Sequence, residues 1–287
     1  MVNNGTPPLM LIVMPNVRHR EADYELDPEL MRRLWRMEER HFWHAARNRW
    51  IRRALLRYGA PPPARILDVG CGSGAVAGML HAHGYGVVGI DTGELLVRKA
   101  DERFPDVTFV AGEIERLAPE FGPFDALGFF DVLEHLDDPG ALMASALAHA
   151  RPGALVLATV PALMALYSTV DWLSGHKRRY EPGELKGLFM GRGLVDVAEH
   201  GIFRVLHPVL RLRRKPTDEA VVALQSRVSM DPEARRAILA ADTRIPMLPA
   251  NALLGLACAV EERAAFDRSR DKAGPTLLVV GRTPARR

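Results

Sequence analysis

Residues 65–74, with the sequence RILDVGCGSG, constrain the fold of this 287-residue chain more than any other stretch. Ile66, Leu67 and Val69 form a short apolar run that predicts a buried strand, and glycines at alternate positions then end it. Residues 74–80 are typical of a helix start. Glycine lets a ligand approach the backbone closely, and a helix start offers free N–H groups. The strand, turn and helix therefore predict a nucleotide-type binding site.

The glycine pattern alone fits two cofactors. Gly70, Gly72 and Ala75 satisfy the G-x-G-x-x-A dinucleotide fingerprint. Asp91 ends the next predicted strand, near the ~20-residue spacing of a ribose-binding acid, and would serve NAD and S-adenosylmethionine equally. Asp68 favours the second, because a carboxylate repels a pyrophosphate but attracts an ammonium and a sulfonium. The alternative is that turn amides satisfy Asp68, which then binds no ligand.

The composition excludes several classes of protein. A net charge of +3 is too small to indicate a nucleic-acid partner, and 48% hydrophobic residues support a large core. Two cysteines, Cys71 and Cys258, rule out a disulfide framework and fit a reducing compartment. No zinc-ligand spacing is present, so we expect no metal. Residues 245–260 are too short and too interrupted to span a bilayer, which predicts a cytoplasmic protein without a transmembrane segment.

Strand and helix patterns alternate along the middle of the chain. Apolar runs predict further strands at residues 86–91, 107–111, 124–130, 154–160, 195–200 and 276–281. This alternation predicts an α/β fold with a doubly wound, mostly parallel sheet, whose ligands bind at the carboxyl ends of the strands. We divide the chain into an N-terminal arm (1–26), a helical lid (27–60), a binding core (61–204), a helical insertion (205–273) and a last strand with its tail (274–287).

Three motifs together resemble one superfamily. Residues 67–74 (LDVGCGSG) resemble the first motif of class I S-adenosylmethionine-dependent methyltransferases. Residues 130–139 (FDVLEHLDDP) are similar to their fourth motif, in the form seen in ubiquinone-biosynthesis-type O-methyltransferases, and residues 175–180 (GHKRRY) resemble a later motif. The resemblance covers about residues 40–204 and implies a seven-stranded, Rossmann-like methyltransferase fold. The insertion at 205–273 departs from that pattern, and we expect it to contact the substrate or a second copy in a homodimer.

Position and resemblance together assign the donor site. Asp91 and Thr92 are expected at the ribose, Glu113 and Ile114 at the adenine, and Phe130 at the methionine side. An arginine upstream of the first strand is expected to bind the donor carboxylate, with a plain surface arginine as the alternative. The complete expected set for S-adenosylmethionine is Arg47, Asp68, Gly70, Cys71, Gly72, Gly74, Asp91, Thr92, Glu113, Ile114, Phe130 and Asp131.

The acceptor side needs a base if a hydroxyl is methylated. His135 and His176 are the candidates, because a neutral imidazole abstracts protons near pH 7; Glu134 could orient His135 or ligate a metal. Residues that could contact the acceptor are Phe42, Trp43, Arg179 and Tyr180, with core packing as the alternative for the two aromatic residues.

The sequence therefore predicts methyl transfer from S-adenosylmethionine to a small-molecule acceptor, with O-methylation as the first choice. N- or C-methylation, an NAD(P)-dependent oxidoreductase and a catalytically silent subunit stay as alternatives. We further expect the helices at 27–58 and the apolar stripe at 253–260 to enclose the acceptor pocket as a lid.

Overall fold

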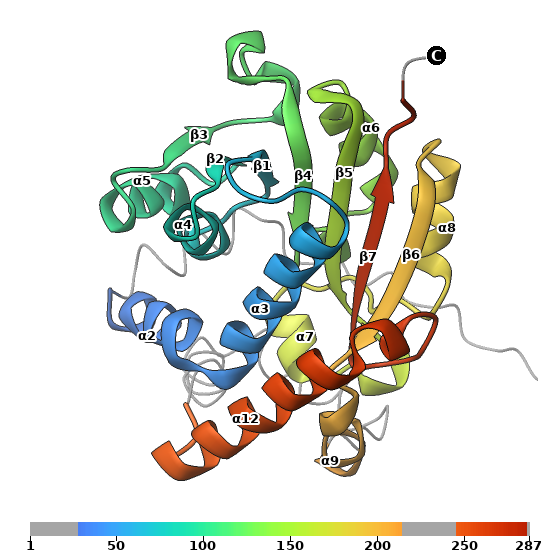
Figure 1. Cartoon of the computed structure of the whole chain (residues 1–287). Helices are drawn as coiled ribbons and strands as arrows, with labels where there is room; N and C mark the ends of the chain where they lie inside the picture. Colours follow the sequence, from blue (N-terminus) through green and yellow to red (C-terminus); the bar gives the residue numbers. More distant parts are fainter. Residues whose placement is uncertain (1–27, 214–244, 286–287) are drawn as a thin grey trace, which may run out of the picture.

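A computed structural model of the chain describes residues 28–213 and 245–285. Within them, seven strands form one sheet of order β3-β2-β1-β4-β5-β7-β6 (Figure 1). β1 to β5 pair in parallel, whereas β7 runs antiparallel to both β5 and β6. The predicted mostly parallel, doubly wound sheet is confirmed. The strands are β1 (Arg65–Val69), β2 (Gly86–Asp91), β3 (Thr108–Ala111), β4 (Phe124–Phe130), β5 (Ala150–Pro161), β6 (Val195–Ile202) and β7 (Thr276–Arg282).

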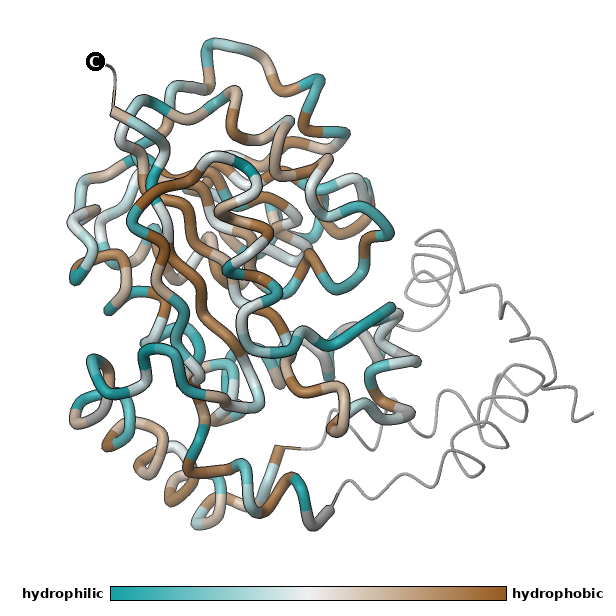
Figure 2. Tube along the Cα trace, turned by 90° about the vertical axis from the view of Figure 1, so that its right-hand side faces the viewer, coloured by the Kyte–Doolittle hydropathy of each residue, from teal (hydrophilic) through white to brown (hydrophobic). Residues whose placement is uncertain are grey.

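Helices pack on both faces of this sheet (Figure 1). Strand residues alternate between the faces, so that Ile66 joins a core with Trp50 of α3, while Leu67 joins a core with Phe189 of α8. Both faces are thus apolar, which is typical of parallel sheets. Figure 2 shows the strands as runs of hydrophobic residues. The α-helices are α2 (Pro28–Arg40), α3 (Phe42–Arg57), α4 (Ala75–Ala82), α5 (Glu94–Arg103), α6 (Pro139–Leu147), α7 (Thr169–Leu173), α8 (Glu184–Gly191), α9 (His207–Arg213) and α12 (Leu248–Ala265).

The order of the strands creates a crevice beside β1. The chain goes from β1 outward to β2 and β3, then returns to place β4 on the other side of β1. Because β1, β2 and β4 are parallel, their carboxyl ends meet at one edge, where Asp68 pairs in register with Gly89 and Gly128. This is the topological switch point at which ligands bind in such sheets.

The described part of the insertion packs against α3 and does not form a wall of the acceptor pocket. Glu262 of α12 is buried and forms an ion pair with Arg53, and the Asn251 Oδ1 atom accepts a hydrogen bond from Phe42 N at 3.0 Å. The apolar stripe that we expected to line the acceptor pocket points to solvent instead. Its large members Leu253, Leu256 and Val260 are 66%, 61% and 57% exposed.

That expectation was wrong because apolar periodicity identified the stripe, whereas the helix docks through a different face that carries Leu254, Cys258 and Glu262. A homodimer contact for the insertion stays a prediction. The arm at 1–26 and residues 214–244 of the insertion lie outside the described residues. Among the helices that the structure describes, each is too short or too polar to cross a membrane.

Candidate functional site

A cavity of about 400 Å³ opens at the carboxyl ends of β1, β2 and β4. Its floor is the glycine loop after β1, and helices α2 and α3 contribute Trp35, Glu38, His44 and Arg47 to its wall. The structure brings ten of the predicted site residues to this cavity: Arg47, Gly70, Cys71, Gly72, Asp91, Thr92, Ile114, Phe130, Asp131 and His135.

The glycine loop is folded by positive backbone φ angles, which favour glycine. Gly70, Gly72 and Gly74 have φ of 74°, 53° and 76°. At Gly70 a Cβ would lie 2.4 Å from the Val132 side chain, so no larger residue fits there without a rearrangement. Gly74 immediately precedes α4 and does not line the cavity, so its role is to turn the chain into the helix.

Asp91 is held rigidly at the end of β2. Its Oδ2 atom accepts a hydrogen bond from Gly72 N at 2.9 Å, and its Oδ1 atom accepts one from Gly93 N at 2.8 Å. The two amides fix the carboxylate at the cavity wall, directly beside the glycine loop. A carboxylate in this position can accept hydrogen bonds from a pair of vicinal hydroxyls, as a ribose presents.

Arg47 and Asp131 form an ion pair across the cavity wall. Arg47 reaches from α3 to the Asp131 carboxylate at the end of β4, whose other oxygen accepts a hydrogen bond from Thr159 Oγ1 at 2.9 Å. Arg47 is only 7% exposed, which excludes the alternative of a surface arginine. The guanidinium is therefore a fixed positive charge beside the glycine loop, suited to an anionic group of a ligand.

Asp68 lies in the core and is absent from the cavity lining. It is 1% exposed, and burial raises its pKa to about 7, with Arg47 opposing this and Asp91 adding to it. Its Oδ2 atom has no hydrogen-bond partner among the described residues. Asp68 does not contact the cavity, so a role toward a bound ligand would have to come from its charge. Burial likewise raises the pKa of the Cys71 thiol well above its ordinary value, so the thiol stays protonated.

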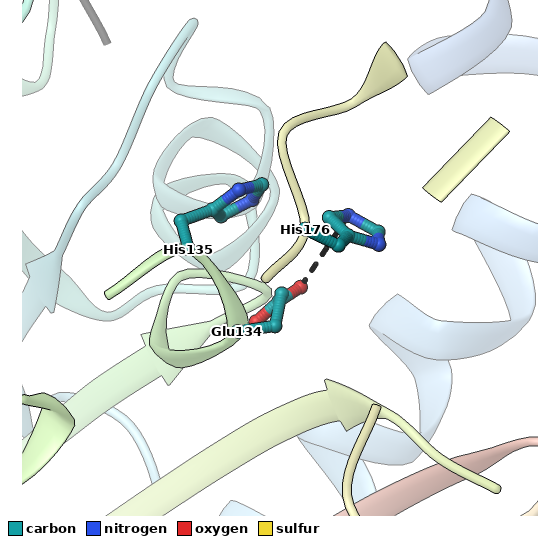
Figure 3. Close-up of side chains that lie close together, drawn as sticks. All are labelled: Glu134, His135 and His176. Atoms are coloured by element: carbon teal, nitrogen blue, oxygen red, sulfur yellow. Dashed lines mark ion pairs between the residues drawn. The ribbon is translucent and has the colours of Figure 1, made fainter. Parts of the chain in front are cut away.

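The two predicted bases meet although they are far apart in the sequence. His135 lies in the 3₁₀ turn Leu133–His135 after β4, and His176 comes from the connection after β5; their ring centroids are 4.8 Å apart (Figure 3). The His135 Nδ1 atom lies 3.1 Å from the Gly175 carbonyl, and the His176 Nδ1 atom lies 3.0 Å from Asp171 Oδ1. His135 lines the cavity, whereas His176 stands behind it next to Glu134, which is fully buried.

Glu134, His135 and His176 could hold a divalent cation. One ligand atom from each lies within 4.8 Å of the others. Two imidazoles and a carboxylate form a donor set that several divalent ions accept. The prediction of no metal was based on the lack of a ligand motif in the sequence. A search for local motifs cannot find ligands that converge from distant segments. That prediction therefore stays open.

Three of the cavity residues that the sequence reasoning missed come from α2 and α3. Glu38 accepts hydrogen bonds from Ser73 Oγ at 2.7 and 2.8 Å and pairs with Arg103 at 2.8 Å, which ties α2 to the glycine loop. Burial lowers the pKa of His44 to about 3, with Arg47 adding to this, so the imidazole is neutral. Trp35 also lines the cavity. Spacing could have found His44, because it lies three residues before Arg47 on the same helix face.

Arg179 and Tyr180, two of the residues that could contact the acceptor, have structural partners instead. Arg179 is buried, pairs with Asp171 at 2.6 Å and donates to the Ala162 carbonyl at 3.1 Å. The Tyr180 hydroxyl donates to the Leu133 carbonyl at 3.2 Å. Neither residue lines the cavity, so the structure does not support their assignment to the acceptor.

The remaining candidates also lie outside the cavity lining. Trp43 packs on Phe203 with ring centroids 4.1 Å apart, and Phe42 stacks on His41 at 4.6 Å. This matches the core-packing alternative for the two aromatic residues. Glu113 precedes the 3₁₀ turn that positions Ile114, and its side chain lies 3.8 Å from Arg116 on the surface. Of the expected adenine pair, only Ile114 reaches the cavity.

Known proteins share this fold and parts of the sequence. The family model described as "Methyltransferase domain" matches residues 42–199. A ubiquinone biosynthesis O-methyltransferase of Caulobacter vibrioides is 28% identical over 221 residues, covering 67% of this chain and 85% of that protein. The Bordetella bronchiseptica enzyme of the same name is 31% identical over 151 residues, covering 50% of this chain and only 61% of its own length.

A demethylmenaquinone methyltransferase of Beutenbergia cavernae is 32% identical, over 43% of this chain and 49% of that enzyme. Among solved structures, a S-adenosylmethionine-dependent methyltransferase of Thermotoga maritima superposes with a TM-score of 0.53 at 12% identity, covering 91% of this chain and 99% of that one. A methyltransferase of Haloferax volcanii, solved with the Trm112 activator, gives 0.51 at 20% identity, covering 93% and 98%. At these identities the structures show a shared fold.

Proposed function

The chain belongs to the methyltransferase-domain family, as a class I S-adenosylmethionine-dependent enzyme, and from this premise we propose that it methylates a hydroxyl oxygen of a small molecule. The observation that carries the proposal is the pair of imidazoles at the carboxyl end of β4, with His135 in the cavity lining. A hydroxyl must lose its proton as it takes the methyl group, and an imidazole is the side chain best suited to accept that proton near pH 7.

The cavity fits the donor. Asp91 can bind two ribose hydroxyls, while Ile114, Leu136 and Leu142 offer an apolar wall for the adenine. Arg47 is placed for the donor carboxylate, and the buried Asp68 carboxylate favours a cationic ligand nearby. S-adenosylmethionine supplies an activated methyl on a sulfonium, so these residues mainly bind, orient and exclude water.

The names of the relatives suggest the first acceptors to test. Ubiquinone biosynthesis O-methyltransferases and a demethylmenaquinone methyltransferase are similar to this chain. Hydroxylated aromatic rings of the quinone-precursor type are therefore the first acceptors to test. Because only some of these names specify oxygen, the methylated atom has to be determined from the product. NMR of the product separates O- from C-methylation.

The test uses methyl-labelled S-adenosylmethionine with a panel of hydroxylated aromatic compounds. We expect His135→Ala or His176→Ala to lower turnover by ~10²–10⁴ without a change in donor affinity. His81→Ala on the exposed end of α4 is the matched control and should leave turnover unchanged. If His135→Ala and His176→Ala both keep the wild-type rate across the pH range, the proposal of an imidazole base is wrong.

A second candidate uses the same residues with a bound ion. The convergence of Glu134, His135 and His176 within 4.8 Å favours a divalent cation that would lower the pKa of the acceptor hydroxyl. Thermal unfolding after chelation, with and without added Mg²⁺, Mn²⁺ or Zn²⁺, tests this. If an added ion stabilises the wild type and Glu134→Gln abolishes that stabilisation, the hypothesis of a bound cation is supported. If unfolding and turnover are the same before and after chelation, the imidazole base is the mechanism.

A further inference from the structure

A threonine of β5 lies behind the ion pair between Arg47 and Asp131 at the donor cavity. Thr159 is fully buried and is not part of the cavity lining. Its Oγ1 atom donates a hydrogen bond to Asp131 Oδ1 at 2.9 Å, and its carbonyl accepts one from the Asp131 amide, also at 2.9 Å. Both the side chain and the backbone of Asp131 are therefore attached to a single residue of the neighbouring strand.

The backbone of Asp131 adopts a left-handed conformation where the chain leaves β4. Its φ angle is 57°, in the region that favours glycine. The preceding residue, Phe130, ends β4 and pairs in register with Thr159. The turn brings the Asp131 carboxylate to the cavity wall, where the side chain is 31% exposed. A strained residue that presents a polar group to a cavity is a reason to look for a function there.

The second carboxylate oxygen of Asp131 holds Arg47 of α3. The Arg47 Nη1 atom pairs with Asp131 Oδ2, while Nε and Nη2 lie 3.4 Å and 3.3 Å from Asn48 Oδ1. A guanidinium carries five N–H groups, so the contacts with these two described residues leave one N–H on each terminal nitrogen. Asp131 is the charged partner of the two, and its position therefore determines where the guanidinium lies.

This ion pair matches the amino-acid end of the methyl donor. That end carries a carboxylate and an ammonium on the same carbon atom, and the cavity wall offers a guanidinium and a carboxylate in direct contact. A ligand with two opposite charges on one carbon is sensitive to the spacing and the orientation of its two partners. The residues that fix the pair therefore matter for donor binding.

We propose that Thr159 is a positioning residue for donor binding, which acts through Asp131 to hold Arg47 where it meets the carboxylate of the donor. The inference rests on the proposed function for the assignment of Arg47, and it does not depend on the acceptor. Thr159→Val keeps the shape of the side chain and removes the hydroxyl. The Asp131 carboxylate then loses its buried anchor and can turn, and Arg47 moves with it.

The test compares two ligands that differ at the amino-acid end. S-adenosylhomocysteine has the complete end, whereas 5′-methylthioadenosine has the same adenosine and a thioether sulfur but no amino-acid group. Calorimetric titration of the full-length protein with each ligand gives the ratio of the two affinities. We expect Thr159→Val to reduce the preference for S-adenosylhomocysteine about tenfold, at the lower end of what one charge-assisted hydrogen bond contributes, and to leave the affinity for methylthioadenosine unchanged.

Three further variants make this result specific. Thr159→Ser keeps the hydroxyl and should keep the wild-type ratio. Thr276→Val changes a second buried threonine, at the start of β7 and outside the cavity lining, and should also keep it. Asp131→Gly removes the carboxylate without backbone strain, because a φ of 57° suits glycine. It should reduce the ratio at least as far, and Thr159→Val should have no additional effect in that background.

The same ratio shows when the proposal is wrong. An unchanged ratio in Thr159→Val overturns it, as does the same loss in Thr159→Ser. Equal weakening of both ligands also overturns it, because that result indicates a structural role. An additional loss in the double variant means that Thr159 does not act through Asp131. Asp131→Gly decides alone if Thr159→Val does not fold, and an unchanged ratio there overturns the proposal.

The binding test and the turnover assay fail independently. No acceptor is present in the titrations, so a protein that methylates no hydroxyl can still show the expected loss in Thr159→Val, and the positioning role then stands. Arg47→Gln tests the assignment on which the inference rests. If this variant keeps the wild-type ratio, the donor carboxylate binds elsewhere, and the role of Thr159 is rejected together with that of Arg47.

Discussion

Asp68 is a buried acid whose protonation should make the stability of the donor-free protein depend on pH. Its folded pKa is about 7, against an ordinary value of 3.8, because burial disfavours the charged form. Between these two pH values the folded chain holds a proton that the unfolded chain has lost, so stability falls as pH rises. Below the ordinary pKa, Asp68 is protonated in both states and costs the folded protein no stability. Above about pH 7 it is ionised in both states, and the loss of stability no longer changes with pH. Asp68→Asn removes the ionisation and keeps the shape of the side chain.

The size of the effect follows from the two pKa values. At 1.36 kcal/mol for each pH unit, ionising Asp68 costs the folded protein about 1.5 kcal/mol at pH 5 and about 4 kcal/mol at pH 8. We therefore expect Asp68→Asn to be more stable than wild type, with a gain that grows by roughly 2–3 kcal/mol between the two pH values.

Urea unfolding of the donor-free protein at pH 5 and pH 8 measures this gain. Asp106→Asn, which removes an exposed carboxylate before β3, controls for the loss of one negative charge. A gain for Asp68→Asn that is equal at both pH values, or a loss at pH 8, would refute the reasoning. The same variant should lose affinity for S-adenosylmethionine more than for S-adenosylhomocysteine, because only the former carries the sulfonium charge.

Three further predictions follow from other parts of the structure. Asp91→Ala should weaken donor binding by ~10-fold or more in calorimetry, since each charge-assisted bond contributes about 1.5–3 kcal/mol; unchanged affinity would contradict the ribose assignment. Gly201→Ala should lower stability by about 1–3 kcal/mol in thermal unfolding. Its Cβ would lie 2.0 Å from the Lys272 carbonyl, whereas Gly187→Ala on α8 meets nothing within 4 Å and is the control. On donor-product binding, hydrogen exchange should slow in residues 41–47 if the N-terminal helices act as a lid, and no change there would argue against it.

Local patterns were sufficient to predict the sheet and the donor loop. The alternation of apolar runs and glycine turns places each strand within a few residues, because strand ends are set by local chain chemistry. β5 begins at Ala150, earlier than expected, since its first residues pair with Phe124 across a bulge. Such a bulge is a property of two strands together and leaves no mark on either segment alone.

The acceptor side was harder to predict, because polar residues in a motif can serve the protein itself. Arg179 and Tyr180 look like ligands for an anion, yet they bond to Asp171 and to a backbone carbonyl. His135 and His176 were recognised separately, but their contact depends on a connection that folds back onto β4. The apolar stripe of α12 misled for a related reason, since the helix docks through a mixed face on which Leu254 and Cys258 pack on the core and Glu262 pairs with Arg53.

The most direct test of the account is a calorimetric titration of the purified full-length chain with S-adenosylhomocysteine and, separately, with NADH. The account predicts binding of S-adenosylhomocysteine at one site per chain, weakened by Asp91→Ala, and no binding of NADH. Binding of NADH with none of S-adenosylhomocysteine would contradict it, because the same glycine loop and Asp91 would then serve a dinucleotide.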